Sequence, residues 1–175
     1  MIEIIYDPDD PSVPDKQILD LMQKAAELIV SNADAVSEVS EVSLSFATPE
    51  EIKDLNKAYR DKDSVTDVLS FPQKFEEEYD EAPGSGKSEG SENDAEPEEP
   101  EKDVPYSYGD VVICTERAIA QAEDYGHSPD REILYLFVHG MFHLFGYDHK
   151  NEEERLKMRE AEEMVLLELN LTRDK

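Results

Sequence analysis

The sequence lacks several features that mark particular classes of protein. It has no tryptophan and a single cysteine, Cys114, among 175 residues, so no disulfide can form within the chain and a disulfide-stapled secreted fold is excluded. No run approaches the ~18 apolar residues of a membrane helix. The start of the chain has neither the basic region nor the long apolar segment of a signal peptide. The sequence therefore predicts a soluble, cytoplasmic protein with no membrane partner.

Positive charge is also scarce. The chain has 17 basic residues against 44 acidic ones, a net charge of -27, so the molecule as a whole repels polyanions. Any interaction with a nucleic acid needs a local cationic or metal site. The length suits one domain with a real core, and we predict a single domain over residues 1–175.

Much of the negative charge is concentrated in residues 74–103. This segment holds 13 acidic and three basic residues, together with three glycines and three prolines. It has almost nothing to bury, so it cannot offset the entropy lost on ordering. We predict a disordered acidic insert at about residues 74–103, placed inside a domain whose strand pattern resumes after it.

The remaining segments predict an α+β fold, with a small mixed sheet of about four strands packed with about five helices. Apolar alternation and β-branched runs predict strands at residues 2–6, 42–46, 65–71 and 110–114. Helical spacing of apolar residues and capping signals predict helices at residues 15–29, 49–59, 116–125, 129–145 and 152–169. The predicted N-caps are Thr48, Thr115, Ser128 and Asn151, and Glu51 completes a capping box with Thr48. The helix at 129–145 is apolar on most sides, which predicts a central buried helix.

Three of the four histidines fall within eleven residues, at His139, His143 and His149. The first two are four apart on the predicted central helix, so both imidazoles leave the same face. Gly146 can adopt the left-handed conformation that turns the chain back, which lets His149 reach the same point. Three imidazoles with a fourth position open are typical of catalytic zinc. We predict one Zn²⁺ per chain, on ligands that also accept nickel or copper.

Zinc in such a site favours hydrolysis or transesterification. The histidine spacing matches the peptidase pattern H-E-x-x-H-x-x-G-x-x-H except at Gly140, where a peptidase has its general-base glutamate. A metalloprotease is therefore an alternative that Gly140 opposes. Asp148 is interpreted as the partner of an imidazole or as a helix cap, with a role as base left open. His127 is interpreted as a cap of the preceding helix.

The histidine motif resembles that of the YbeY endoribonucleases, a family of rRNA maturation factors. Two further stretches are similar to the family, Leu55–Pro72 (LNKAYRDKDSVTDVLSFP) and Tyr108–Ile113 (YGDVVI). The resemblance implies a zinc-dependent endoribonuclease that prefers single-stranded RNA and acts in rRNA processing and ribosome quality control. It also implies association with the small ribosomal subunit and its assembly factors. The family usually has a short connection where this chain has the acidic insert.

The resemblance further implies catalytic roles for Arg60 and for the three histidines, because the family places this arginine near the metal. A guanidinium suits a phosphodiester, since its planar fork pairs with phosphate oxygens. Alternatively, Arg60 and Lys62 form surface pairs with Asp61 and Asp63. Three more polar residues of this stretch either line a cleft or fix a turn: Thr66, Asp67 and Ser70.

A third function is also open, that of a non-catalytic ribosome assembly factor. In that case zinc mainly stabilises the fold, and the acidic surface binds basic ribosomal proteins.

Overall fold

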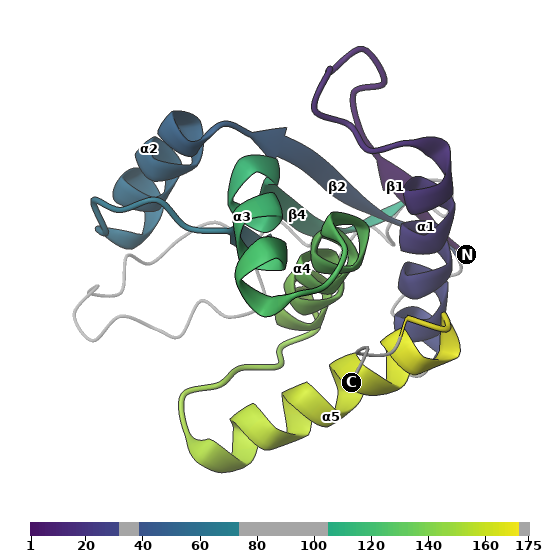
Figure 1. The fold of residues 1–175 in the computed structure, drawn as a ribbon. Helices are drawn as coiled ribbons and strands as arrows, with labels where there is room; N and C mark the ends of the chain where they lie inside the picture. Colours follow the sequence, from purple (N-terminus) through teal and green to yellow (C-terminus); the bar gives the residue numbers. More distant parts are fainter. Residues whose placement is uncertain (32–38, 74–104, 172–175) are drawn as a thin grey trace, which may run out of the picture. The chain divides into compact units, whose positions relative to one another are not determined.

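A mixed sheet of four strands organises the part of the chain that the structure, a computed structural model, describes: residues 1–31, 39–73 and 105–171 (Figure 1). In spatial order the strands are β1 (Ile2–Ile5), β2 (Ser40–Ala47), β4 (Tyr106–Cys114) and β3 (Val68–Pro72). The first three run parallel to one another, and β3 runs antiparallel to β4. Beyond β3, the N–H of Gln73 donates to the carbonyl of Tyr108 (3.1 Å).

The described residues also form five helices. They are α1 (Lys16–Ser31), α2 (Pro49–Arg60), α3 (Thr115–Tyr125), α4 (Pro129–Leu144) and α5 (Glu152–Glu168). The element order is β1-α1-β2-α2-β3-β4-α3-α4-α5, which is the predicted order. The predicted α+β class is therefore confirmed.

The two faces of the sheet carry different helices. Because side chains alternate along a strand, Val111 and Ile113 of β4 join the main core with α1 and α4. Val112 and Cys114 point the other way and pack with Ile52 of α2. Cys114 is fully buried and packs as a small core residue, and burial raises the pKa of its thiol.

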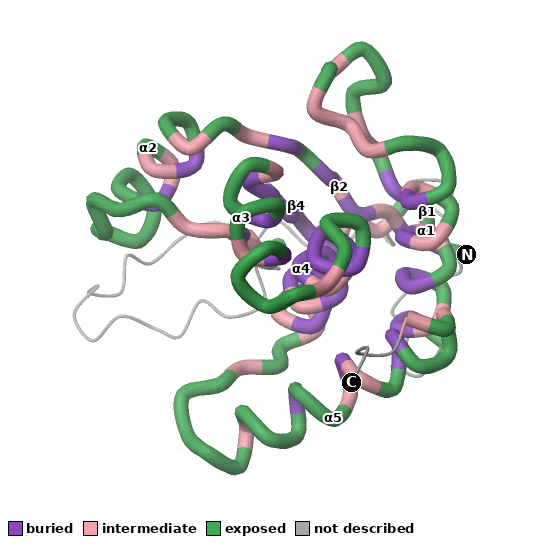
Figure 2. Tube along the Cα trace, viewed as in Figure 1, coloured by how far each residue is buried: buried purple, intermediate pink, exposed green. Residues whose placement is uncertain are grey.

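Helix α4 is the buried centre of the main core, as the sequence predicted. It contacts α1, α3, α5 and two strands, and Figure 2 shows it as the most continuously buried helix. Gly140 lies close against the sheet, because a Cβ atom there would lie 2.8 Å from Cγ1 of Val111. Four side chains of α4 are completely buried: Leu134, Phe137, Val138 and Met141.

Most predicted helix starts are confirmed by their caps. The Thr48 hydroxyl accepts from the N–H of Glu51, while the Glu51 carboxylate accepts from the N–H of Thr48, which forms the predicted capping box. Ser128 caps α4 and Asn151 caps α5, each through its side-chain oxygen. The predicted cap at Thr115 is wrong, because β4 continues directly into α3 and Thr115 is already the first helical residue.

Two strand starts differ most from the prediction. Strand β3 begins at Val68 rather than residue 65, and β4 begins at Tyr106 rather than residue 110. Both limits follow from pairing, because Val68 lies opposite Ile113 while Tyr106 lies opposite Ser40 of β2. The residues of one strand do not by themselves show where its pairing with a neighbouring strand begins.

The predicted acidic insert lies outside the described residues. All of the described residues belong to one compact unit; a single domain over the whole of residues 1–175 stays a prediction. No helix in the described ranges is both long and apolar enough to cross a lipid bilayer.

Candidate metal centre

His139, His143 and His149 converge at the C-terminal end of α4. The first two are one helical turn apart, and the helix ends at Leu144 with Phe145 as its C-cap. Gly146 then adopts the left-handed conformation (φ +82°), which turns the chain back toward the helix. One nitrogen from each imidazole lies within 4.8 Å of the other two. Among the described residues, this is the one group of three or more side chains with the geometry to hold a metal ion.

Hydrogen bonds fix the tautomers of two of these imidazoles. Nδ1 of His143 lies 2.9 Å from the carbonyl oxygen of Tyr147, and Nδ1 of His139 lies 2.7 Å from Oε1 of Glu162. A carbonyl and a carboxylate only accept hydrogen bonds, so both Nδ1 atoms carry the proton. In the neutral imidazoles, each Nε2 atom then presents a lone pair.

These two Nε2 atoms face each other at 3.1 Å. With both protons held elsewhere, the facing lone pairs repel unless a cation lies against them. Two nitrogens bound to one tetrahedral zinc, at about 2.0–2.1 Å each, are roughly 3.3 Å apart. The donor set thus fits a metal ion, with neutral imidazoles supplied from one helix and the turn that follows it.

The environment of His143 favours the neutral form that a metal needs. Burial, followed by the neighbouring His139, lowers the pKa of His143, and the bond to Tyr147 opposes this only in part. His149 is exposed, whereas the other two imidazoles are half-buried. The site is therefore open on the side of His149.

Glu162 of α5 is the functional residue that the sequence analysis missed. It is only 2% exposed, and it accepts hydrogen bonds from His139 and from the hydroxyl of Tyr135. Burial and this carboxylate raise the pKa of Tyr135, so the hydroxyl keeps its proton. A signal was present, because Glu162 interrupts an apolar stripe formed by Met158, Val165 and Leu166.

Asp148 takes neither of the two roles favoured for it from the sequence, imidazole partner or cap of α5. Its Oδ1 accepts from the N–H of His149 (2.7 Å) and its Oδ2 lies 2.7 Å from Nζ of Lys150. The carboxylate therefore stabilises the turn that carries His149. The residue that caps α5 is Asn151. Glu162 takes the place in the histidine network that Asp148 was expected to fill.

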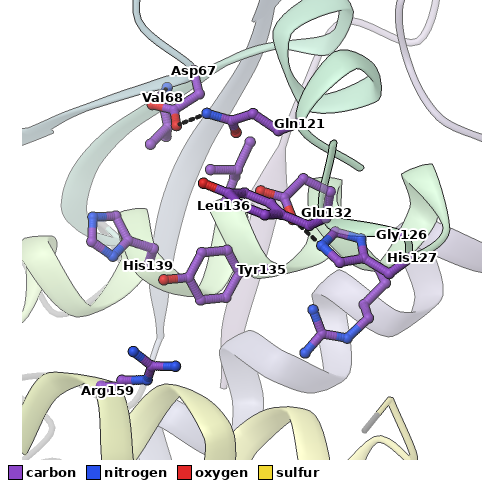
Figure 3. Close-up of a pocket in the computed structure, with 12 residues that line it drawn as sticks. Asp67, Val68, Gln121, Gly126, His127, Glu132, Tyr135, Leu136, His139 and Arg159 are labelled. Atoms are coloured by element: carbon purple, nitrogen blue, oxygen red, sulfur yellow. Dashed lines mark hydrogen bonds and ion pairs between the residues drawn. The ribbon is translucent and has the colours of Figure 1, made fainter. Parts of the chain in front are cut away.

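A cavity of about 590 Å³ lies beside the metal centre, and His139 forms part of its wall (Figure 3). We call it the α4 cavity; its polar lining includes Asp67, Gln121, Arg131, Glu132, Tyr135 and Arg159. Asp67 both lines this cavity and fixes a turn, the two roles weighed from the sequence. Its carboxylate accepts from Gln121 (2.9 Å), the Thr66 hydroxyl (3.2 Å) and the N–H of Val68 (2.9 Å).

His127 does not belong to the group of three histidines. The N–H of His127 bonds the carbonyl of Ala122 at the end of α3, as a cap does, and its ring lies 3.0 Å from Glu132. Arg60 is the exposed last residue of α2 and does not line the α4 cavity. Its predicted place near the metal stays a prediction.

The alternative role of Arg60 and Lys62 in surface ion pairs finds no support at Asp63. That carboxylate is bound instead by Lys53 (3.3 Å) and Lys57 (3.1 Å). These two lysines lower the pKa of Asp63.

The sequence and the fold both have known relatives. The family model described as "Endoribonuclease YbeY" matches residues 4–170. The chain belongs to the YbeY family of endoribonucleases. This confirms the resemblance drawn from the three sequence motifs.

Individual YbeY relatives support the same conclusion. The chain is 42% identical over 173 residues to Endoribonuclease YbeY of Thermoanaerobacter sp. (strain X514), covering 98% of this chain and 100% of the relative. It is 46% identical over 154 residues to Endoribonuclease YbeY of Caldanaerobacter subterraneus subsp. tengcongensis, covering 87% and 88%.

A similar solved structure is the solution structure of TM1509 from Thermotoga maritima. It is 25% identical, with a TM-score of 0.54, and covers 97% of this chain and 92% of that chain.

Proposed function

We propose that this protein is a zinc-dependent endoribonuclease that cuts single-stranded segments of ribosomal RNA. His139, His143 and His149 hold one Zn²⁺ per chain. The observation that carries the proposal is the convergence of three imidazoles in a member of the YbeY family, with the Nε2 atoms of His139 and His143 3.1 Å apart. Neutral imidazoles arranged in this way offer their lone pairs to one shared cation.

Zinc bound there would polarise a phosphodiester oxygen and lower the pKa of a water molecule. The protein's own residues supply position and charge. Glu162 orients His139, and the carbonyl of Tyr147 orients His143, so that the ligands are arranged before the metal binds. We assign to Arg60 the binding of phosphate oxygens, for which a guanidinium fork is suited. The metal and this cation offer local attraction to RNA in a chain whose net charge is -27.

The place in ribosome maturation rests on family membership. The relatives are named as endoribonucleases, which supports RNA as the substrate class. The resemblance drawn from the sequence motifs supports rRNA processing in the cytoplasm, with the small ribosomal subunit and its assembly factors as partners.

The peptidase alternative is opposed by the packing of Gly140. This position faces β4, where even a Cβ atom would lie 2.8 Å from Val111. A glutamate there would have to displace the sheet contact, so the position that holds the base in zinc peptidases is closed in this fold.

The proposal is tested with an RNA hairpin that carries a single-stranded 3′ tail. Zinc-loaded wild-type protein is compared with His143→Ala and Arg60→Ala, and Arg117→Ala serves as a matched control because Arg117 is another exposed helical arginine. We expect cleavage of the tail by the wild type and by the control, no cleavage by His143→Ala, and a loss of about tenfold or more for Arg60→Ala. The chemistry of the product ends identifies the nucleophile.

Equal, faint cleavage by all four proteins would show contamination and overturn the enzyme assignment. The same samples then distinguish the remaining alternative. Zinc-dependent binding to small ribosomal subunits without cleavage would identify a non-catalytic assembly factor.

A further inference from the structure

The α4 cavity contains a buried cation that the metal centre does not use. Arg131 is only 5% exposed, and its Nε and Nη2 atoms have no hydrogen-bond partner within the described residues. A buried guanidinium that leaves N–H groups unpaired is costly, since it loses hydration without gaining an acceptor. The position therefore favours a ligand that brings acceptor oxygens and negative charge.

The location of Arg131 in its helix strengthens this argument. It lies in the first turn of α4, where Ser128 Oγ accepts from its backbone N–H (3.3 Å). The positive end of the helix dipole disfavours a cation and favours an anion there. Without a bound anion, both burial and the helix dipole therefore destabilise the charged guanidinium of Arg131.

The two carboxylates that line the cavity already have other partners. Asp67 accepts from Gln121, and Glu132 lies 3.0 Å from Nε2 of His127 (Figure 3). Neither is hydrogen-bonded to the Nε or Nη2 atom of Arg131.

A second cation lines the same cavity from another helix. Arg159 of α5 is exposed, and Figure 3 shows its guanidinium directed toward the hydroxyl of Tyr135, beside His139. Its positive charge lowers the pKa of Tyr135, against the larger effect of burial. Arg131, Tyr135 and His139 are spaced by four residues along α4, so the cavity follows one face of the helix up to a metal ligand.

We propose that the α4 cavity is a phosphate-binding subsite, in which Arg131 and Arg159 hold an internal phosphodiester of the RNA strand that flanks the linkage cut at the metal. This inference rests on the proposed endoribonuclease function. Arg131 lies eight residues before His139, about 12 Å along the helix. A single strand that follows this face has one phosphate in the cavity while another part of its backbone is at the metal centre.

The test measures RNA binding separately from cleavage. The probe is a fluorescent single-stranded oligoribonucleotide with 2′-O-methyl riboses, and its dissociation constant for the zinc-loaded protein is measured at several salt concentrations. Arg131→Gln and Arg159→Gln are compared with Arg117→Gln, an exposed arginine of α3 outside the cavity. Arg159 is on the surface, so its variant tests the proposal even if Arg131→Gln fails to fold.

We expect Arg131→Gln to weaken binding by about tenfold and Arg159→Gln by roughly threefold, because the first contact is buried and the second is screened by solvent. The slope of log affinity against log salt should fall by about 0.7 for each lost phosphate contact. Arg117→Gln should change neither quantity. Equal affinity and equal slope for all four proteins would overturn the subsite.

The outcomes separate this inference from the proposed function. If the wild type cuts RNA but the cavity variants bind normally, the endoribonuclease stands and the subsite is wrong. If the variants lose affinity and salt dependence although the wild type cuts nothing, the subsite stands and the proposed reaction is wrong. An effect seen only with a 5′-phosphorylated probe would indicate a terminal phosphate site and overturn the assignment to an internal linkage.

Discussion

Nδ1 of His139 on α4 lies 2.7 Å from Oε1 of Glu162 on α5, two residues 23 positions apart in the chain. The contact connects the last long helix to the metal centre. The buried carboxylate of Glu162 accepts a hydrogen bond from Nδ1 of His139. This bond orients the imidazole and makes its Nε2 atom more basic. We therefore expect the position of α5 to affect the affinity for a metal bound by His139.

Replacing Glu162 by Gln should lower the affinity for zinc by about 10- to 100-fold, because the amide keeps an acceptor but removes the charge. The measurement is a competition titration against a chromophoric chelator. Glu160→Gln is the matched control, since Glu160 is an exposed acid on the same helix. Identical zinc affinity in both variants would show that Glu162 does not support the metal site.

Gly140→Ala should destabilise the fold, although the same change in a helix interior ordinarily stabilises by roughly 0.5–1 kcal/mol. The added Cβ would lie 2.8 Å from Cγ1 of Val111, a fully buried side chain that cannot move aside freely. We expect the free energy of unfolding in urea to fall by about 1–3 kcal/mol.

Val111→Ala provides the corresponding control, because it removes the methyl groups that clash. The double variant should lose less stability than the sum of the two single changes. Additive losses, or a more stable Gly140→Ala protein, would show that α4 and β4 approach less closely than described.

Gly146→Ala should weaken zinc binding through the turn that presents His149. Gly146 has φ +82° and nothing within 4 Å of an added Cβ, so the cost is one of backbone conformation, about 1–2 kcal/mol. Relief of that strain requires the turn to move, and His149 moves with it.

Gly126 is a close match, with φ +72° and equally open surroundings at the end of α3. Gly126→Ala should lower the thermal midpoint by a similar amount and leave the zinc affinity unchanged. Parallel losses of zinc affinity in both variants would mean that the turn at Gly146 has no special role.

Glu51→Gln should lower the thermal midpoint at neutral pH, and the difference from wild type should vanish in acid. The N–H of Thr48, and then its hydroxyl, lower the pKa of Glu51 below its usual 4.5. A carboxyl whose pKa is lower in the folded protein stabilises the fold above about pH 4.5, and this contribution is lost as the pH falls through the folded value.

Glu50→Gln is the control for this effect, because Glu50 is in the same helical turn but outside the capping box. The thermal midpoints of the three proteins are measured over a pH series. The comparison separates the stabilisation by the capping box from the general effect of a negative charge near the start of a helix. A Glu51→Gln difference that persists unchanged in strong acid would contradict the assignment.

Local signals in the sequence predicted most of what local interactions determine. The caps at Thr48, Ser128 and Asn151, the order of the elements and the central position of α4 all depend on residues close in sequence. The convergence of the histidines was also predictable, because a helical turn and one glycine are enough to bring them together. Membership of the family followed from the histidine motif together with the stretches at residues 55–72 and 108–113.

Features that depend on distant partners were not predictable in the same way. The early start of β4 is determined by its pairing with β2, and Thr115 is not a cap because the strand runs straight into the helix. Glu162 was missed because its partner lies on another helix, and an acid within an apolar stripe does not indicate which group it faces. The Nε and Nη2 atoms of Arg131, which have no hydrogen-bond partner within the described residues, likewise could be identified only from the structure.

The antiparallel pairing of β3 with β4 has an evolutionary consequence. Pro72 lies opposite Gly109, and Gln73 is bonded to Tyr108, so residues 73 and 108 are fixed as neighbours whatever number of residues separates them. The entropy of closing a loop grows only logarithmically, by about 0.6 kcal/mol for each doubling of its length. Residues can therefore be gained or lost between these strands with little effect on the stability of the sheet. A lineage can change the charge and the partners of this connection while the histidine centre stays as it is.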